Sequence, residues 1–286
     1  MAHLKSKTLF FTTSPRSPLK MIPEIEALHN NFEGKIWNTD TQVEFIKKLA
    51  EGSEFEGQGS DKDMALSARD RITRAPKALG FVDLKPVIKL TEPGEKLLSG
   101  KRTEEVLLRQ LLKFQLPSPY HKEPEKFNGL FGVKPYLEIF RLIYEIGTIS
   151  FDELMMFGMQ LTHYNKFEQV VSEIKQFRRM RVYAEASYKI FRGNYLRNEV
   201  EKIYQEEITE GNTKTRESRD KSLDKFVKTK ASNMRDYADA CFRYLRATGM
   251  VEISQRGYSL SITPEKKAEV EYFLRTIDRK PVYIDD

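Results

Sequence analysis

The sequence contains a single cysteine and no long apolar run, and each scarcity excludes a class of protein. Cys241 alone can form no disulfide within the chain and cannot supply the several thiolates of a cysteine zinc site. No stretch approaches the ~20 apolar residues that a membrane-spanning helix needs. The first residues also lack the apolar core and the cleavage site of a signal peptide. We therefore expect a cytoplasmic protein without a membrane partner.

Recognisable catalytic motifs are missing as well. There is no phosphate-binding loop of the GxxxxGK[ST] type, and the histidines are too scattered to pair as metal ligands: His3, His29, His121 and His163. A metal-dependent nuclease centre needs an Asp and a Glu-x-Lys set on adjoining strands. Glu33-Gly34-Lys35 and Glu173-Ile174-Lys175 match the short pattern, but we expect the first in a turn and the second inside a helix. We assign no catalytic residue, metal ligand or cofactor to this chain.

What is present favours a folded protein with a polyanionic partner. A length of 286 residues suggests two compact units, and 40% hydrophobic residues suffice to form their cores. Lys and Arg number 48 against 42 Asp and Glu, which gives a net charge of +6. This basic excess favours a polyanion without identifying it.

A helix and a hairpin are predicted in the first third of the chain. The pattern predicts a helix from Asp61 through Leu79, and Gly80 follows as a typical helix end. Strands are predicted at 81–82 and 87–90, after which Thr91 begins another helix. The predicted order is therefore helix, strand, turn, strand, helix.

The same order recurs near the other end of the chain. Arg235-Asp236 opens a predicted helix, Gly249 ends it, and strands follow at 250–251 and 258–262. Thr263-Pro264-Glu265 then corresponds to the segment that begins at Thr91 in the first copy. We infer an internal repeat.

A glycine-ended helix followed by a hairpin is typical of the second half of a winged helix. In such a unit the helix enters a major groove while the hairpin contacts the DNA backbone. The alternative is an ordinary αββα element with no role in nucleic-acid binding. The predicted fold class is mainly α with small β-hairpins (α+β), arranged as tandem winged-helix-like DNA-binding subdomains.

Amphipathic spacing predicts further helices at 22–28, 43–49, 107–114, 136–146, 151–159 and 167–180. Ser150 is a candidate N-cap for the helix from Phe151. That helix and the one from Asn165 also have helix-turn-helix proportions, so a third DNA-facing module remains open.

Basic residues concentrate on the two repeated helices. The first helix carries Arg69, Arg71, Arg74 and Lys77, and the second copy carries Arg235, Arg243 and Arg246, with Arg256 on the predicted wing. Residues three and four positions apart share a helix face, so a basic stripe that contacts phosphates or guanine edges is predicted. The alternative is a solvated helix surface, with Asp70 paired to a neighbouring arginine.

A third basic segment lies upstream of the second copy. Seven basic residues oppose three acidic ones between Lys214 and Lys230: Lys214, Arg216, Arg219, Lys221, Lys225, Lys228 and Lys230. We interpret this segment as a flexible loop that becomes ordered on DNA, with Lys221, Lys225 and Lys228 as candidate phosphate contacts. A solubilising linker is the alternative.

Several ordered blocks extend along nearly the whole chain: Ser14–Pro18, Phe32–Trp37, Ser67–Arg71, Gly80–Val82, Leu116–Lys122, Gln176–Arg178 and Arg235–Ala240. With these blocks the chain resembles AlwI-type type IIS restriction endonucleases and the related large subunits of site-specific nicking endonucleases. The resemblance implies an N-terminal half that binds a short asymmetric DNA site through winged-helix subdomains. It also implies a separate C-terminal nuclease domain with a PD-(D/E)xK centre. Basic residues within or beside the blocks complete the candidate DNA contacts: Arg16, Lys20, His121 and Lys122.

Because the chain ends at Asp286, we expect only the recognition region of such a type II site-specific deoxyribonuclease, non-catalytic by itself. Mg²⁺ is then expected only for the missing nuclease domain. The expected partners are double-stranded DNA and a nuclease domain or second cutting subunit.

We expect recognition subdomains at 1–105 and 130–286, joined by a connector at 106–129. The alternatives are a complete endonuclease with an unrecognised active site and a winged-helix scaffold for protein interactions.

Overall fold

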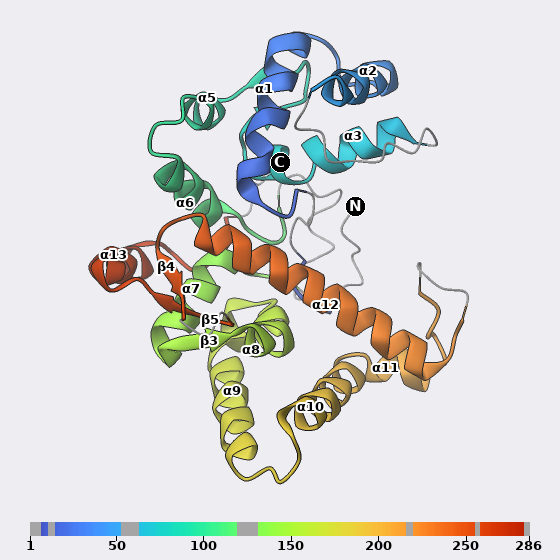
Figure 1. The fold of residues 1–286 in the computed structure, drawn as a ribbon, viewed down its shortest axis with the longest axis vertical. Helices are drawn as coiled ribbons and strands as arrows, with labels where there is room; N and C mark the ends of the chain where they lie inside the picture. Colours follow the sequence, from blue (N-terminus) through green and yellow to red (C-terminus); the bar gives the residue numbers. More distant parts are fainter. Residues whose placement is uncertain are drawn as a thin grey trace. The chain divides into compact units, whose positions relative to one another are not determined.

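The computed structural model describes residues 7–10, 15–52, 63–118, 131–215, 220–254 and 258–282 (Figure 1). The chain forms two compact units, each assembled from segments that are separate in the sequence. The larger unit comprises Met1–Phe11, Gln115–Phe242 and Glu252–Asp286, and the smaller unit comprises Thr12–Phe114 and Arg243–Val251. Within the described ranges, no helix is both long enough and apolar enough to cross a membrane.

The smaller unit is helical and contains one short hairpin. Its elements are η1 (Pro18–Lys20), α1 (Met21–Phe32), α2 (Thr39–Ala50), α3 (Met64–Ile72), α4 (Ala75–Ala78), β1 (Val82–Asp83), β2 (Lys89–Leu90), α5 (Glu92–Leu98) and α6 (Thr103–Lys113). Helices α1, α2 and α3 pack against one another. The hairpin is antiparallel, with Val82 opposite Leu90. The predicted helices at 22–28, 43–49 and 107–114 are confirmed.

Polar side chains cap the N-termini of α2, α3 and α5. The side chains of Asn38, Asp63 and Thr91 each accept a hydrogen bond from the backbone N–H three residues later. Such caps satisfy N–H groups that the first helical turn leaves without a partner. The predicted start of a helix at Thr91 is therefore confirmed.

The prediction of one continuous helix from Asp61 to Leu79 is wrong. Asp61 itself lies outside the described residues, α3 ends at Ile72, and α4 begins only at Ala75. Pro76 has no N–H to donate to the preceding turn, and its ring would clash there, so an unbroken helix is disfavoured. Proline suits the first turn of a helix, which is where it stands in α4.

The larger unit combines helices with a three-stranded antiparallel sheet. Its elements are α7 (Pro135–Ile146), β3 (Thr148–Ser150), α8 (Phe151–Met156), η3 (Gly158–Gln160), η4 (Tyr164–Lys166), α9 (Phe167–Val182), α10 (Tyr188–Ile203), α11 (Gln205–Thr209), most of α12 (Leu223–Arg246), β4 (Val251–Ile253), β5 (Ser259–Ile262), η5 (Pro264–Lys266) and α13 (Lys267–Thr276). The strand order is β3-β5-β4, and buried Ile149 lies opposite buried Leu260. The predicted helices at 136–146 and 167–180 are confirmed.

Ser150 caps α8, as predicted. Its Oγ accepts from the Glu153 N–H at 3.2 Å, and the Glu153 carboxylate accepts from the Ser150 N–H at 2.8 Å. The two residues form a capping box. The helix is shorter than the predicted 151–159, because it ends at Met156 and gives way to a 3₁₀ turn beginning at Gly158. Glycine is a poor helix former, which favours termination there.

The second copy of the predicted repeat begins much earlier than expected. Instead of opening at Arg235, α12 runs without interruption over 24 residues from Leu223 to Arg246. The prediction of a flexible loop is therefore wrong for Lys225, Lys228 and Lys230, which lie in this helix. The segment contains no Gly or Pro, and buried apolar residues follow a helical period along it: Phe226, Val227, Met234, Ala238, Cys241 and Leu245. Burial of this apolar stripe stabilises the helix, although the polar composition of the segment is typical of a loop.

Both predicted helix-hairpin-helix orders are otherwise present. Gly80 and Gly249 have φ of +75° and +69°, a left-handed conformation that glycine adopts without strain. Each follows a helix and precedes a hairpin, β1–β2 in the first copy and β4–β5 in the second. The hairpin of the second copy differs because β5 also pairs with β3, a strand about a hundred residues earlier in the chain.

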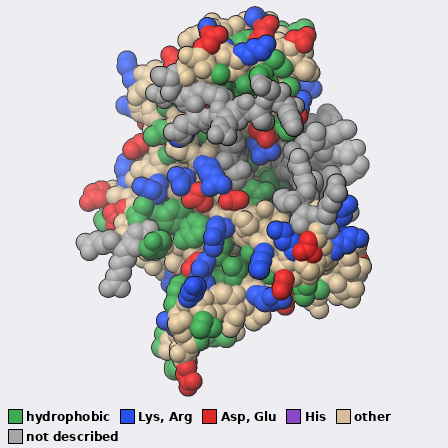
Figure 2. All heavy atoms as spheres, turned by 45° about the vertical axis from the view of Figure 1, so that its right-hand side comes forward, with side chains coloured by type: hydrophobic (Ala, Val, Ile, Leu, Met, Phe, Trp, Pro, Cys, Tyr) green, Lys and Arg blue, Asp and Glu red, His purple; other side chains and the backbone are tan. Residues whose placement is uncertain are grey.

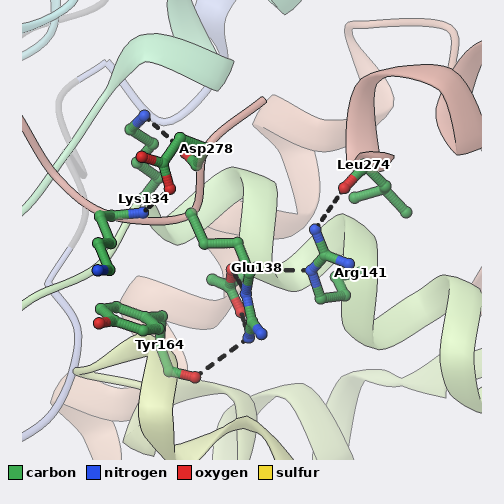
Figure 3. A network of polar contacts seen from close by, with 8 residues as sticks. Lys134, Glu138, Arg141, Tyr164, Leu274 and Asp278 are labelled. Carbon is green, nitrogen blue, oxygen red and sulfur yellow. Dashed lines mark hydrogen bonds and ion pairs between the residues drawn. The ribbon is translucent and has the colours of Figure 1, made fainter. Parts of the chain in front are cut away.

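A buried carboxylate joins α7 to the segment after α13 in the larger unit (Figure 3). Glu138 is fully buried and accepts two hydrogen bonds from Arg279, at 2.8 and 2.7 Å. Arg279 also donates to the Tyr164 carbonyl, while Arg141 donates to the Leu274 carbonyl. The hydrogen bond to Glu138 raises the pKa of Arg279. These contacts anchor the C-terminal segment on α7.

Candidate nucleic-acid interface

Helix α12 carries a row of exposed basic side chains along one face: Lys225, Lys228, Arg235, Arg243 and Arg246. At 3.6 residues per turn these positions fall within about 80° of the helix circumference. Ser232 and Asp239 lie on the same face, and the buried apolar stripe occupies the other side. Lys225 and Lys228, predicted to lie in a loop, therefore share one helix face with the arginines of the second copy.

The length of this row suits a contact with duplex DNA. Lys225 and Arg246 are 21 positions apart, 246 − 225, which corresponds to about 31 Å along the helix axis. One turn of B-DNA spans roughly 34 Å. Asp239 is the acidic side chain on this face, against five basic ones. Figure 2 shows Lys and Arg side chains spread over the visible surface, with hydrophobic side chains between them.

Two lysines near the row differ from it in their surroundings. Lys230 projects away from the row, with its Nζ 4.6 Å from the ring centroid of Tyr204 and 5.2 Å from that of Phe226. Lys221 precedes α12; its side chain is exposed, and its carbonyl accepts a hydrogen bond from Thr213. Lys221 therefore stays among the candidate contacts, whereas Lys230 is held by cation–π contacts within the larger unit.

Among the basic residues of the first copy, Arg71 has a structural partner. Its guanidinium donates to Glu24 of α1, whose side chain is 7% exposed. Burial raises the pKa of Glu24, and the charge of Arg71 acts in the opposite direction. Arg71 thus neutralises a buried carboxylate, a role that competes with the predicted reading of bases.

The other three basic residues of this segment do not form a single stripe. Arg69 is exposed on α3, and Arg74 pairs with Asp70 at 2.9 Å, as the alternative interpretation allowed. Lys77 lies on the separate helix α4, where burial and the charge of Lys85 lower its pKa. The break between α3 and α4 removes the continuous face on which the predicted stripe depended.

The remaining candidates lie near the start of the smaller unit or outside the described residues. Arg16 and Lys20 are exposed immediately before α1. His121, Lys122 and Arg256 fall outside the described residues.

Arg69 and Arg71 are expected to give different phenotypes. Arg71→Ala leaves Glu24 buried without its partner and should lower the free energy of unfolding by about 3 kcal/mol. Arg69→Ala should leave stability nearly unchanged and weaken discrimination among single-base variants of a bound duplex by about 1–3 kcal/mol. Urea unfolding and competition binding measure the two effects. Loss of discrimination with Arg71→Ala at unchanged stability would assign the reading role to Arg71 instead.

Neither Glu-x-Lys tripeptide lies on a strand, as predicted. Glu33 follows the last residue of α1, and Gly34 has φ of +79°. Glu173 lies inside α9, where it accepts hydrogen bonds from Gln169 and Lys202 at 3.1 and 3.0 Å. Across the described ranges, no three His, Cys, Asp or Glu side chains gather as candidate metal ligands.

Comparison with known proteins gives two findings. A sequence model of the AlwI restriction endonuclease family matches residues 77–284. Among solved structures, the chain is similar to the binding domain of the BpuJ1 endonuclease, determined in complex with pyrene- and phenanthrene-modified DNA. The TM-score is 0.56 at 12% identity, over 91% of this chain and 81% of that one, so this likeness concerns the fold. No curated protein matches the chain.

Proposed function

The chain belongs to the AlwI restriction endonuclease family, and on this premise we propose that it recognises a short asymmetric site in double-stranded DNA. The observation that carries the proposal is the basic face of α12. Lysines and arginines on such a face bind phosphates irrespective of sequence, and an arginine can instead bond two acceptors on a guanine edge. The fold shared with a DNA-complexed endonuclease binding domain supports the same role.

We further propose that the two helix-hairpin orders are winged-helix-like recognition subdomains, within residues 1–105 and 130–286 and joined by 106–129. In the smaller unit, α1, α2 and α3 pack together and are followed by the β1–β2 hairpin. In the larger unit, β3 follows α7, and the sheet order β3-β5-β4 places the hairpin beside it. Both arrangements are typical of a helix bundle with a wing, which supports the assignment.

Strand cleavage is assigned to another part of the enzyme system. The Glu-x-Lys tripeptides lie in a turn and a helix rather than on adjoining strands, which disfavours a nuclease centre there. We propose that a nuclease domain or a second cutting subunit supplies the Mg²⁺-dependent step, and that the enzyme acts in the cytoplasm.

Selection from a random duplex pool tests this function. One asymmetric sequence should be enriched and bound at least about 10³-fold more tightly than random duplex. Its affinity should fall steeply with rising salt, because bound phosphates release condensed cations. With Mg²⁺ added, a plasmid carrying the site should stay intact. Equal affinity for all sequences, or no binding, would refute the recognition role, and reproducible nicking would refute the separation of binding from cleavage.

A further inference from the structure

Exposed apolar side chains lie at the end of α9, in the connection to α10 and at the start of α10. Val182 and Tyr183 are 78% and 84% exposed, and Met180 and Ile190 are 46% and 56% exposed. Figure 1 shows this connection at the end of the α9–α10 hairpin that lies away from strands β3 and β5. Several large apolar side chains exposed within one short segment favour a binding surface there.

The hairpin behind this tip is firmly held. Two acidic residues in the first turn of α8 anchor it: Glu153 accepts from Arg178 of α9 at 2.6 Å, and Asp152 accepts from Arg192 of α10 at 2.8 Å. The Tyr188 hydroxyl donates to Asp152 at 2.7 Å. The tip is therefore presented by an ordered support.

Aromatic packing reinforces this support. The Phe177 ring of α9 lies 5.3 Å from that of Phe191 and 4.9 Å from that of Tyr195, both on α10. Phe157, which follows α8, packs against both Phe177 and Tyr195. Because these rings fill the inner side of the hairpin, the apolar side chains at the tip are not required for its packing.

The charged side chains at the tip indicate which kind of partner it binds. Arg178 and Arg192 are neutralised by α8, and Arg181 lies over the Tyr188 ring at 5.3 Å. Arg179 and Lys189 are exposed and form no side-chain ion pair with any described residue. Between them Glu185 is the one acidic residue, so the surface is apolar with a basic border. A polyanion that also offers apolar surface fits it best.

We propose that this tip, residues 180–190, is a second contact with duplex DNA, separate from the basic face of α12. The proposal rests on the recognition role proposed above. The walls of a DNA groove present deoxyribose and base edges between rows of phosphates, and apolar side chains insert there in known minor-groove complexes. Val182 and Tyr183 would pack against the groove wall, and Arg179 and Lys189 would contact the flanking phosphates.

The test uses two pairs of substitutions in the full chain on the selected duplex. Arg179→Ala with Lys189→Ala should lower the salt dependence, the slope of log K against log salt, by about 1.8, or 0.9 for each phosphate contact. Val182→Ser with Tyr183→Ser should weaken affinity about tenfold with little change in that slope. Matched controls are Lys47→Ala with Lys101→Ala, and Tyr272→Ser, which remove exposed side chains of the same kinds elsewhere.

Each outcome decides the proposal. If the wild-type chain binds the duplex and both tip pairs keep its affinity and slope, the tip contact is overturned while the recognition role stands. If the wild-type chain binds no duplex, both the tip contact and the recognition role are refuted. If the apolar pair abolishes self-association measured by sedimentation but leaves DNA affinity intact, the tip is an interface between copies of this chain. Circular dichroism of each variant establishes that the helices are retained.

Discussion

Replacing Lys225, Lys228 and Arg235 together by alanine is expected to cause the largest loss of DNA affinity of any variant considered. Three phosphate contacts contribute about 2.7 to the slope of log K against log salt, at 0.9 each. At moderate salt the affinity should fall by roughly 10²-fold. Because phosphate contacts carry no sequence information, random duplex should lose affinity in the same proportion as the selected site. Fluorescence anisotropy over a salt series measures both quantities.

The helix itself should survive this substitution. Alanine is the best helix former, and the three side chains are exposed on the side opposite the buried stripe. The triple variant Lys47→Ala, Lys101→Ala and Lys113→Ala removes the same charge from exposed positions of the smaller unit. An equal loss of slope in that variant would mean that net charge, and not the α12 face, governs binding.

Arg279→Met is expected to produce the largest loss of stability. It leaves Glu138 fully buried, and among the described residues Arg141, at 3.8 Å, is then the one remaining ion partner of its carboxylate. Removing one partner of a buried ion pair costs about 3–5 kcal/mol, because the remaining charge cannot be hydrated. Urea unfolding followed by circular dichroism gives the change in unfolding free energy. The exposed Arg275→Met on α13 is the matched control and should change it by less than about 0.5 kcal/mol.

A second substitution separates the charge effect from lost packing. Glu138→Leu combined with Arg279→Met replaces both charges by apolar groups, and such replacements are often neutral. The double variant should therefore recover most of the lost stability. If it is as unstable as Arg279→Met alone, the stability derives from the contacts of Arg279 with Tyr164 and Phe167 rather than from its pairing with Glu138.

Local signals in the sequence predicted those features that depend on a few neighbouring residues. Ser150 and Thr91 cap helices because a side-chain oxygen reaches a backbone N–H three residues away. Gly80 and Gly249 end helices because the required left-handed backbone suits glycine. The family resemblance also depends on short blocks of sequence, and the family match over residues 77–284 confirms it.

The errors arose where a local pattern competed with a longer one. The polar composition before Arg235 indicated a loop, whereas the apolar period from Phe226 to Leu245 decides for a helix. The long α10 gave no signal because it buries few side chains, among them Glu199 and Val200. An apolar period followed over more than four helical turns predicts a helix that includes Lys225 and Lys228.

Residue identity over short spans was enough to predict the family, the helix starts at Ser150 and Thr91, the glycine-ended helices and the basic character of the chain. Only the tertiary structure decided which basic residues are available to a partner. Arg71 and Arg74 have carboxylate partners, on another helix and on the preceding turn, whereas Lys225, Lys228 and Arg235 share one exposed helix face. Pairing of β3 with β5 was likewise beyond sequence reasoning. Ion pairs and strand pairs between distant residues depend on packing that no local pattern encodes.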